Sequence, residues 1–288
     1  MSSRGYGGQT MWGKLERVVV RRPDATFGAV DPGRWHYAGR PDLDAARAEH
    51  DAFVGVVRGS GAEVIYHDDP LPEHADAIFV HDPVLITDRG AVLLRMGKAL
   101  RRGEEAALGR CLERHGVPTL ARLDGDALAE SGDLMWLDQG TLAVGIGFRT
   151  NPAGLAQIRS ALGSGIEIVT VELPYFNGPE ACLHLMSLVS IVDRDLAVTY
   201  PKFLPVPFLQ RLWKQGIETV EVPDTEFVTM GTNVLALGPR RCVMLEGNPF
   251  TQERLEAAGC AVLTYRGREI SLKAEGGATC LTRPVLRS

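Results

Sequence analysis

Short apolar runs alternate with amphipathic segments along the whole chain, and the alternation repeats. Five times, an apolar run of strand length leads through an amphipathic segment to a second apolar run. The segments that share this pattern are 15–69, 90–124, 142–172, 196–223 and 242–267. The pattern predicts five copies of a strand, helix and strand unit.

The amphipathic segments carry the usual signals of helix ends. They cover residues 42–61, 101–116, 151–165, 206–216 and 250–259. Asn151 ahead of Pro152 predicts a capped helix start, and Thr251, two residues before Glu253, predicts another. Gly116 predicts a helix stop. Each unit therefore has one well-delimited helix.

A further apolar run precedes four of the units and is joined to the next run by a tight turn. The segments with this pattern are 81–94, 132–144, 183–198 and 232–245. Three of them turn at DRG, DQG or DRD, which is typical of a β-hairpin. Each unit is therefore expected to be a strand, strand, helix and strand.

The two ends of the chain complete the pattern. Residues 279–288 form a strand without a following partner, and the strand at 15–23 has no preceding one, so we expect them to pair. This pairing closes a ring, a five-bladed α/β propeller of pseudo-fivefold repeats, built as a single domain over residues 1–288. The first unit is longer than the others, and its surplus at 27–42 is rich in Gly, Pro and aromatic residues without a helical or strand period. We interpret this insertion as a lid.

Composition narrows the functional classes. The 288 residues are 45% hydrophobic and 23% charged, as expected of a soluble globular protein, and the net charge of −5 argues against a nucleic-acid partner. The sequence has no apolar run long enough to span a membrane and no signal-peptide core, so we expect a cytoplasmic protein. The five cysteines lack CxxC or metal-like spacing, which argues against a disulfide framework or a zinc site. Most of them are typical of buried core thiols.

In a closed ring, the equivalent junctions of all units meet at the axis. The polar residues at these junctions are Asp76, Asp82, Glu130, Asp133, His184, Asn233 and the segment 275–280. Residues far apart in sequence are therefore expected to share one site.

A thiol, an imidazole and an acid at such a site suggest covalent catalysis. Cys280 follows two glycines that permit an unusual turn, and His184 can hold or deliver a proton near neutral pH. Glu130 and Asp133 are candidates to orient the histidine. Each residue also has a simpler interpretation: a buried core thiol, a core histidine, and two turn residues.

Six short motifs together resemble a known family. EGGATC, LHLMS, ESGD, FVHDPVLITDRG, RRGEE and FRTN, in the same order over nearly the whole chain, are similar to the dimethylarginine dimethylaminohydrolase branch of the arginine deiminase and amidinotransferase superfamily, the penteins. This resemblance implies a five-bladed α/β propeller with its active site on the axis. It also implies that the enzyme needs no cofactor and no metal.

The resemblance implies roles for the central residues. Cys280 is expected to be the nucleophile, His184 the general acid and base, and Glu130 the hydrogen-bond partner of the histidine. Asp82 is expected to hold the guanidinium nitrogens. The implied reaction is thiolate attack on the guanidino carbon, loss of an amine to leave a thiouronium, and hydrolysis to a urea such as that of citrulline.

Further residues are implied to bind the rest of an arginine-like substrate. Arg101 and Arg149 match the arginines that hold the substrate carboxylate, although they also suit surface charges at helix starts. Asp76 suits the α-amino group, and His81 and Asp133 complete the expected substrate-binding set. The expected partner is thus a small guanidino compound, arginine or an N-methylated arginine, and a homodimer is left open.

Two departures from the family pattern leave alternatives. Met186 stands where arginine deiminases have an aspartate, which disfavours plain arginine deimination. His81 stands where dimethylarginine hydrolases have a glutamate; it could contact an N-substituted guanidinium, lie behind the site, or mark a different guanidino compound. The rival functions are an amidinotransferase, disfavoured by chain length, an arginine deiminase or dihydrolase, and a non-catalytic propeller that binds arginine-like ligands. The intact Cys280, His184 and Glu130 argue against the last.

Overall fold

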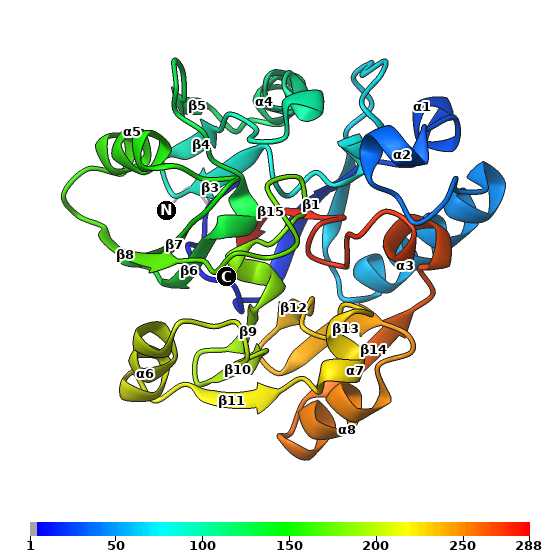
Figure 1. The fold of residues 1–288 in the computed structure, drawn as a ribbon. Coiled ribbons are helices and arrows are strands. Elements are labelled where there is room, and N and C mark those ends of the chain that lie inside the picture. The colour runs from blue at the N-terminus through cyan, green and yellow to red at the C-terminus, as the bar shows by residue number, and fades with distance from the viewer. Residues whose placement is uncertain (1–4) are drawn as a thin grey trace.

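The computed structural model describes residues 5–288 and has five three-stranded sheets arranged in a ring (Figure 1). The inner strands are β3 (Val84–Thr87), β6 (Leu134–Asp138), β9 (Val189–Asp193), β12 (Leu235–Gly238) and β15 (Arg283–Arg287). The middle strands are β1 (Leu15–Val20), β4 (Gly90–Leu93), β7 (Thr141–Ile146), β10 (Leu196–Thr199) and β13 (Arg241–Leu245). The outer strands are β2 (Glu63–Tyr66), β5 (Thr119–Arg122), β8 (Glu167–Glu172), β11 (Glu218–Glu221) and β14 (Ala261–Tyr265).

One long helix connects the middle strand of each sheet to its outer strand. These helices are α3 (Leu43–Gly59), α4 (Glu104–Arg114), α5 (Pro152–Leu162), α6 (Val206–Lys214) and α8 (Pro249–Ala257). Figure 1 shows them on the outside of the ring. Each middle strand pairs antiparallel with its inner neighbour and parallel with its outer one. The strand, strand, helix and strand unit and the five-bladed α/β propeller are therefore confirmed.

The first and last strands close the ring. β1 pairs antiparallel with β15, with Val19 opposite Arg283 and Leu15 opposite Arg287. The pairing inferred from the unpartnered ends of the sequence is thus confirmed. It makes the last strand of the chain the inner strand of the first blade.

Burial explains why the strands were visible in the sequence. Every residue of β3, β4 and β10 is buried, because neighbouring blades cover both faces of the inner and middle strands. The outer strands are half exposed, as in β5 and β8. Continuous apolar runs therefore mark the inner strands, and mixed runs mark the rim.

The helix ends agree with the sequence signals in part. Asn151 caps α5 with its side chain, and Gly116 follows α4 with a φ of 83°. Thr251 is not a cap, because α8 begins two residues earlier, at Pro249. Thr251 is buried inside that helix, and its hydroxyl donates a hydrogen bond of 2.6 Å to Glu226.

The insertion at 27–42 is more regular than its composition suggested. It contains parts of two four-residue helices, α1 (Ala25–Gly28) and α2 (Pro32–Trp35), capped by Asp24 and Asp31. A third short helix, α7 (Asp224–Phe227), follows β11. Such helices are too short to give a periodic apolar pattern, so a pattern search misses them.

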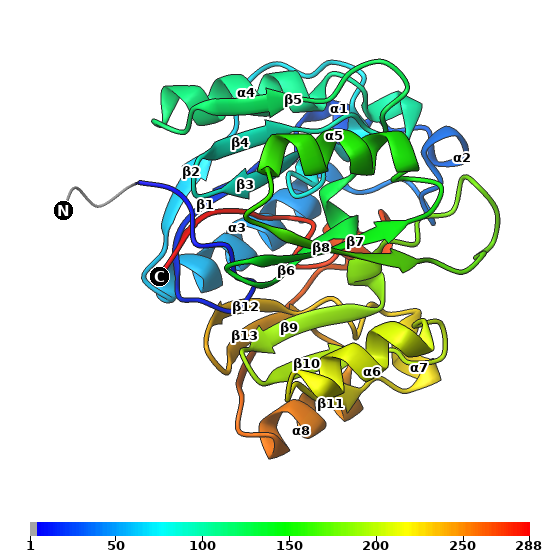
Figure 2. The same cartoon turned by 90° about the vertical axis from the view of Figure 1, so that its left-hand side faces the viewer.

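Single turns of 3₁₀-helix precede the inner strands and carry much of the polar chemistry. Those before inner strands lie at Ala75–Ile78, Ser131–Asp133 and Leu185–Ser187, a further 3₁₀ turn at Ala99–Arg101 lies between β4 and α4, and one π-helical turn lies at Arg268–Leu272. Figure 2 shows α2 and the loop after β8 on the side of the ring opposite the C-terminus. In residues 5–288, none of the helices has the length and apolar character needed to cross a bilayer.

Candidate active site

Seven of the nine expected site residues line one cavity of about 50 Å³. They are Cys280, His184, Glu130, Asp82, Asp76, Arg101 and Arg149. The other lining residues are Trp35, His36, Phe79, Lys98, Glu180, Cys182, Ala274, Glu275 and Gly276. A larger hollow of about 500 Å³ lies between β8 and α6, but its lining in the described chain has neither a cysteine nor a histidine. The chemistry is therefore concentrated in the smaller cavity.

Glycines bring the loop of Cys280 close to its neighbours. A Cβ atom on Gly277 would lie 2.5 Å from the side chain of Asn233, and one on Gly276 would lie 2.1 Å from the ring of Phe79. No larger residue fits at either place without displacing these side chains. The two glycines of the EGGATC motif thus allow the loop to carry Cys280 into the cavity.

Cys280 is held as a neutral thiol. Asn233 donates a hydrogen bond of 3.3 Å from Nδ2 to Sγ, and its Oδ1 accepts from the amide of Thr279 at 2.9 Å. Burial, together with the negative charge of Asp82, raises the pKa of Cys280 to about 11, although Asn233 and His184 act in the opposite direction. A cation arriving beside the sulfur would favour its thiolate.

Glu130 orients His184. Its Oε2 lies 2.8 Å from Nε2 of the imidazole, and its Oε1 accepts a hydrogen bond from the amide of Lys98 at 2.9 Å. Arg149 adds a guanidinium 3.4 Å from both carboxylate oxygens. Burial alone would raise the pKa of Glu130, but the hydrogen bond to His184 and the charge of Arg149 outweigh it and lower the pKa below its usual range. Glu130 is therefore a carboxylate at neutral pH.

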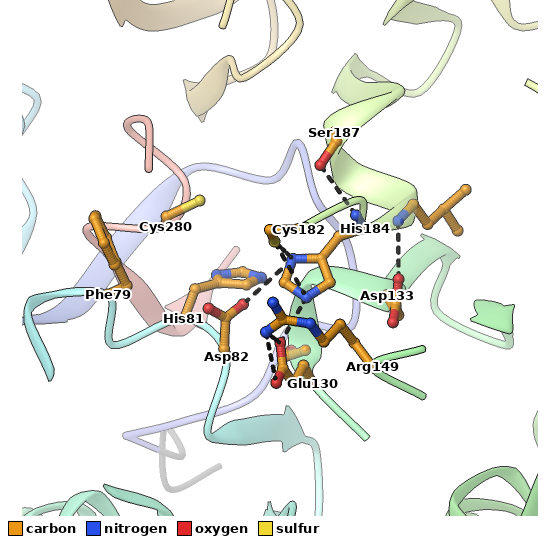
Figure 3. Close-up of polar contacts among 12 residues, drawn as sticks. Phe79, His81, Asp82, Glu130, Asp133, Arg149, Cys182, His184, Ser187 and Cys280 are labelled. Carbon is orange, nitrogen blue, oxygen red and sulfur yellow. Dashed lines mark hydrogen bonds and ion pairs between the residues drawn. The ribbon is translucent and has the colours of Figure 1, made fainter. Parts of the chain in front are cut away.

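The other ring nitrogen of His184 faces Cys182 and Asp82 (Figure 3). Nδ1 lies 3.5 Å from Sγ of Cys182 and 4.0 Å from Oδ1 of Asp82. Burial acts to lower the pKa of His184, but Cys182, Asp133 and Glu130 outweigh it and raise the pKa well above its usual value. The residue is thus an imidazolium with a proton available at Nδ1.

The ESGD motif also depends on close packing. A Cβ atom on Gly132 would lie 2.3 Å from Nδ1 of His184, so only glycine fits beneath the imidazole. Asp133 accepts hydrogen bonds from the amide of Leu185 at 2.9 Å and from the hydroxyl of Thr150 at 2.7 Å. Burial raises the pKa of Asp133 to about 6. Asp133 thereby holds the turn that carries His184 and does not line the cavity.

Asp82 presents one unpartnered oxygen to the site. Its Oδ2 accepts a hydrogen bond of 2.6 Å from Nη1 of Arg101, whereas Oδ1 is buried without a hydrogen-bond partner in the described residues. Arg101 is only 4% exposed, and its other contacts are with Glu104 and the carbonyl of Phe79. Arg101 therefore fixes Asp82 in place, and the free oxygen is suited to accept from a guanidinium.

Asp76 is already engaged by two donors. The hydroxyl of Tyr37 donates to Oδ1 at 2.8 Å, and Nζ of Lys98 lies 2.7 Å from Oδ2. Lys98 also donates to the carbonyl of Trp35 at 3.0 Å and lies 4.9 Å from the centre of its ring. Lys98 was not among the expected site residues, because nothing in its spacing distinguishes it from a surface lysine.

Cys182 was also missed as a cavity residue, whereas Glu275 belongs to the segment 275–280 that was expected at the axis and lines the cavity. Cys182 was interpreted as one of the buried core thiols, but it is only half-buried and lines the cavity. Glu275 has a φ of 59°, and burial raises the pKa of its carboxyl group.

His81 faces away from the cavity. Its Nδ1 lies 3.0 Å from the carbonyl oxygen of Thr282, and its ring lines a separate internal space that Met186 also lines. Burial and the charge of Arg283 lower the pKa of His81 well below its usual value, so the ring is neutral. Of the alternatives left open for His81, the structure supports the one in which it lies behind the site.

The thiol, the carboxylate-oriented imidazolium and the free carboxylate oxygen on the axis of this ring define an enzyme that modifies guanidino groups. A family model for "N,N dimethylarginine dimethylhydrolase, eukaryotic" matches residues 40–287. The chain therefore belongs to the dimethylarginine dimethylaminohydrolase family and is a hydrolase of the dimethylargininase type.

Comparisons with individual proteins agree with this family assignment. The chain is 25% identical over 271 residues to the N(G),N(G)-dimethylarginine dimethylaminohydrolase of Pseudomonas aeruginosa, with 93% of this chain and 98% of the relative covered. It is 32% identical over 389 aligned positions to an arginine deiminase of Mycobacterium avium, with 96% of each covered. A solved structure of the Pseudomonas aeruginosa hydrolase with citrulline has a TM-score of 0.76 at 23% identity, covering 94% of this chain and 99% of that one. This last likeness establishes the shared fold.

The charge of His184 is directly testable. Glu130→Gln removes the carboxylate beside Nε2, so we expect the pKa of His184 to fall by about 1 or more. Because this pKa is raised in the folded state, the imidazolium stabilises the fold below pH ~6.5, and that stabilisation is lost as the pH rises through the folded-state value. Ring ¹⁵N chemical shifts followed by NMR from pH 5 to 10 measure the change. Glu253→Gln, on the exposed face of α8, is the control, and an equal pKa in both variants would contradict the assignment.

Proposed function

We propose that this enzyme hydrolyses N-methylated arginine to citrulline and an amine, with Cys280 as the nucleophile. The observation that carries the proposal is the convergence of Cys280, His184 and the free oxygen of Asp82 on one cavity. The family match and a relative's structure in complex with citrulline support a small guanidino substrate.

Binding begins with charge complementarity. The substrate guanidinium is a planar cation, and Oδ1 of Asp82 accepts a hydrogen bond from one of its nitrogens. The arriving positive charge lowers the pKa of Cys280, whose proton leaves to solvent, and the thiolate then adds to the guanidino carbon. The thiol is thus deprotonated in the presence of substrate, which keeps the resting enzyme unreactive.

His184 then transfers protons in both halves of the reaction. Because Glu130 occupies Nε2, the proton at Nδ1 goes to the departing amine as the carbon–nitrogen bond of the tetrahedral adduct breaks. This leaves a thiouronium on Cys280 and a neutral imidazole. The imidazole takes a proton from the water that attacks the same carbon, and the second adduct then expels the thiolate and loses its hydroxyl proton to solvent, which leaves citrulline.

The central test is product formation. Purified protein with asymmetric dimethylarginine as the only amine should yield citrulline and dimethylamine in equal amounts, measured by mass spectrometry. Cys280→Ser should reduce turnover by about a thousandfold or more with an unchanged melting temperature, since a hydroxyl is a far weaker nucleophile than a thiolate. Cys260→Ser, which alters a thiol outside the cavity, is the matched control.

Two results would refute parts of this proposal. Turnover by Cys280→Ser at the normal rate would remove the nucleophile assignment. Product that forms only when a second amine is added would replace hydrolysis with amidino transfer.

A second candidate is a guanidino acid without an α-amino group, and the Lys98–Asp76 pair favours it. Asp76 would have to bind the α-ammonium of an amino acid, but Lys98 neutralises its charge at 2.7 Å, and Tyr37 engages the other oxygen. Lys98 has three N–H donors, of which Asp76 and Trp35 use two. The third is available to a substrate carboxylate.

The Lys98→Met variant tests this candidate. Methionine retains the apolar stem but not the charge, so Asp76 becomes free to bind an α-ammonium. We expect kcat/KM for dimethylarginine to rise about five- to tenfold, equivalent to about 1–1.4 kcal/mol, relative to that for the same compound without its α-amino group. Lys202→Met, which breaks an exposed pair with Asp224, is the control. An unchanged preference between the two compounds would remove Lys98 from substrate selection.

The insertion at 27–42 is proposed to act as a lid. Trp35 and His36 line the cavity, and Nε2 of His36 lies 3.7 Å from Glu180 on the opposite loop. A cavity of about 50 Å³ holds only a few water molecules, so a methylated arginine requires this roof to move.

Limited proteolysis tests the lid. Arg34 is an exposed trypsin site within the insertion, and we expect citrulline or a substrate analogue to slow cleavage there severalfold. Cleavage at Arg194, exposed in the turn between β9 and β10, should not change. Equal cleavage in the insertion with and without ligand would count against a lid.

A further inference from the structure

Two small internal cavities lie on the axis, apart from the substrate cavity. One has a volume of about 20 Å³. Its lining residues are Gly7, Gly8, Thr10, Met11, Ile86, Trp136, Arg283, Pro284 and Arg287. The other, of about 10 Å³, is lined by residues of β6, β9, β12 and β15 together with His81. Inner strands of all five blades therefore surround this region.

Two buried guanidinium groups share the 20 Å³ cavity. Arg283 is 6% exposed and Arg287 is 5% exposed. Nη1 of Arg287 donates to the carbonyls of Gly13 at 2.6 Å and Ala236 at 2.9 Å. Nη2 of Arg287 and Nε of Arg283 are buried without a hydrogen-bond partner among the described residues. Each guanidinium thus has an N–H group that the protein leaves unused.

The lining provides no counter-charge. Among the described residues, neither cavity is lined by an aspartate or a glutamate. Burial lowers the pKa of Arg283 and of Arg287 to about 9, while the charge of Asp82, which does not line either cavity, acts in the opposite direction on Arg283; both arginines remain cations at neutral pH. Two like charges in a space that no carboxylate lines carry a desolvation penalty, which a bound anion would offset.

We propose that the cavity between Arg283 and Arg287 is a binding site for a monovalent anion of halide size, such as chloride. A volume of about 20 Å³ suits one particle near the size of water and is too small for phosphate or sulfate. The neighbouring 10 Å³ space is different, because the neutral ring of His81 offers it a lone pair. The anion site is therefore confined to the cavity that both arginines line.

The site is connected to the active-site loops through Arg283. Its Nη1 donates to the carbonyl of His81 at 3.1 Å and to the hydroxyl of Ser131 at 2.8 Å. His81 precedes Asp82, and Ser131 follows Glu130. An anion that fixes Arg283 would thus steady the two loops that carry these carboxylates.

Halide binding is tested without any assay of activity. Crystals of the full chain soaked in sodium bromide should give an anomalous difference peak between the two guanidinium groups. In solution, replacing sodium gluconate with sodium chloride or bromide at constant ionic strength should raise the melting temperature by about 2–5 °C in a saturable manner. Absence of both the peak and the saturable shift, or a bound water that bromide does not replace, would overturn the proposal.

A variant pair links the effect to the cavity. Arg287→Met should abolish the halide-dependent rise in melting temperature, whereas Arg241→Met, at an exposed arginine of β13, should retain it. An equal halide response in both variants would also overturn the proposal. If Arg287→Met does not fold, the bromide experiment on the unaltered protein decides whether this cavity binds a halide.

Discussion

The antiparallel pairing of β15 with β1 is the constraint on which the site depends. It closes the ring, and it brings the last ten residues of the chain to the axis, where Cys280 precedes the first residue of β15 by three positions. His184 and Glu130 reach the same axis from the starts of β9 and β6. No two of these residues are close in sequence, so their meeting is a property of ring closure rather than of any local motif.

Around the substrate cavity, buried charges are arranged as matched groups. Arg101 joins Asp82 to Glu104, and Arg149 and His184 both contact Glu130. Buried ion pairs of this kind contribute little net stability, but removing one partner leaves a costly unpaired charge. Their value here is positional: each carboxylate has a single orientation, and Oδ1 of Asp82 has no hydrogen-bond partner within residues 5–288. The cavity is thus prepared for an incoming cation.

Sequence reasoning found the fold because the apolar periodicity is strong and repeated. It also predicted that the central polar residues lie together, as they do around one cavity, since the positions just before the inner strands must converge once a ring closes. It failed where a contact depends on side-chain direction. Lys98 reaches Asp76, and Cys182 reaches His184, through the path of individual loops that carry no periodic signal. The cap assigned to Thr251 failed because Glu226, distant in sequence, binds that hydroxyl within the helix.

The two departures from the family pattern, His81 and Met186, become a single feature in three dimensions. Both line the small space on the axis beneath the substrate cavity, and neither lines the substrate cavity itself. A change of residue type at one of them therefore alters the packing around the other and leaves the set of side chains that face the substrate unchanged. A carboxylate at position 81 would lie in this space close to Arg283, whose charge already lowers the pKa of the histidine there. Because the ring of His81 is neutral, the carboxylate of the next residue, Asp82, supplies the negative charge that acts on Arg283.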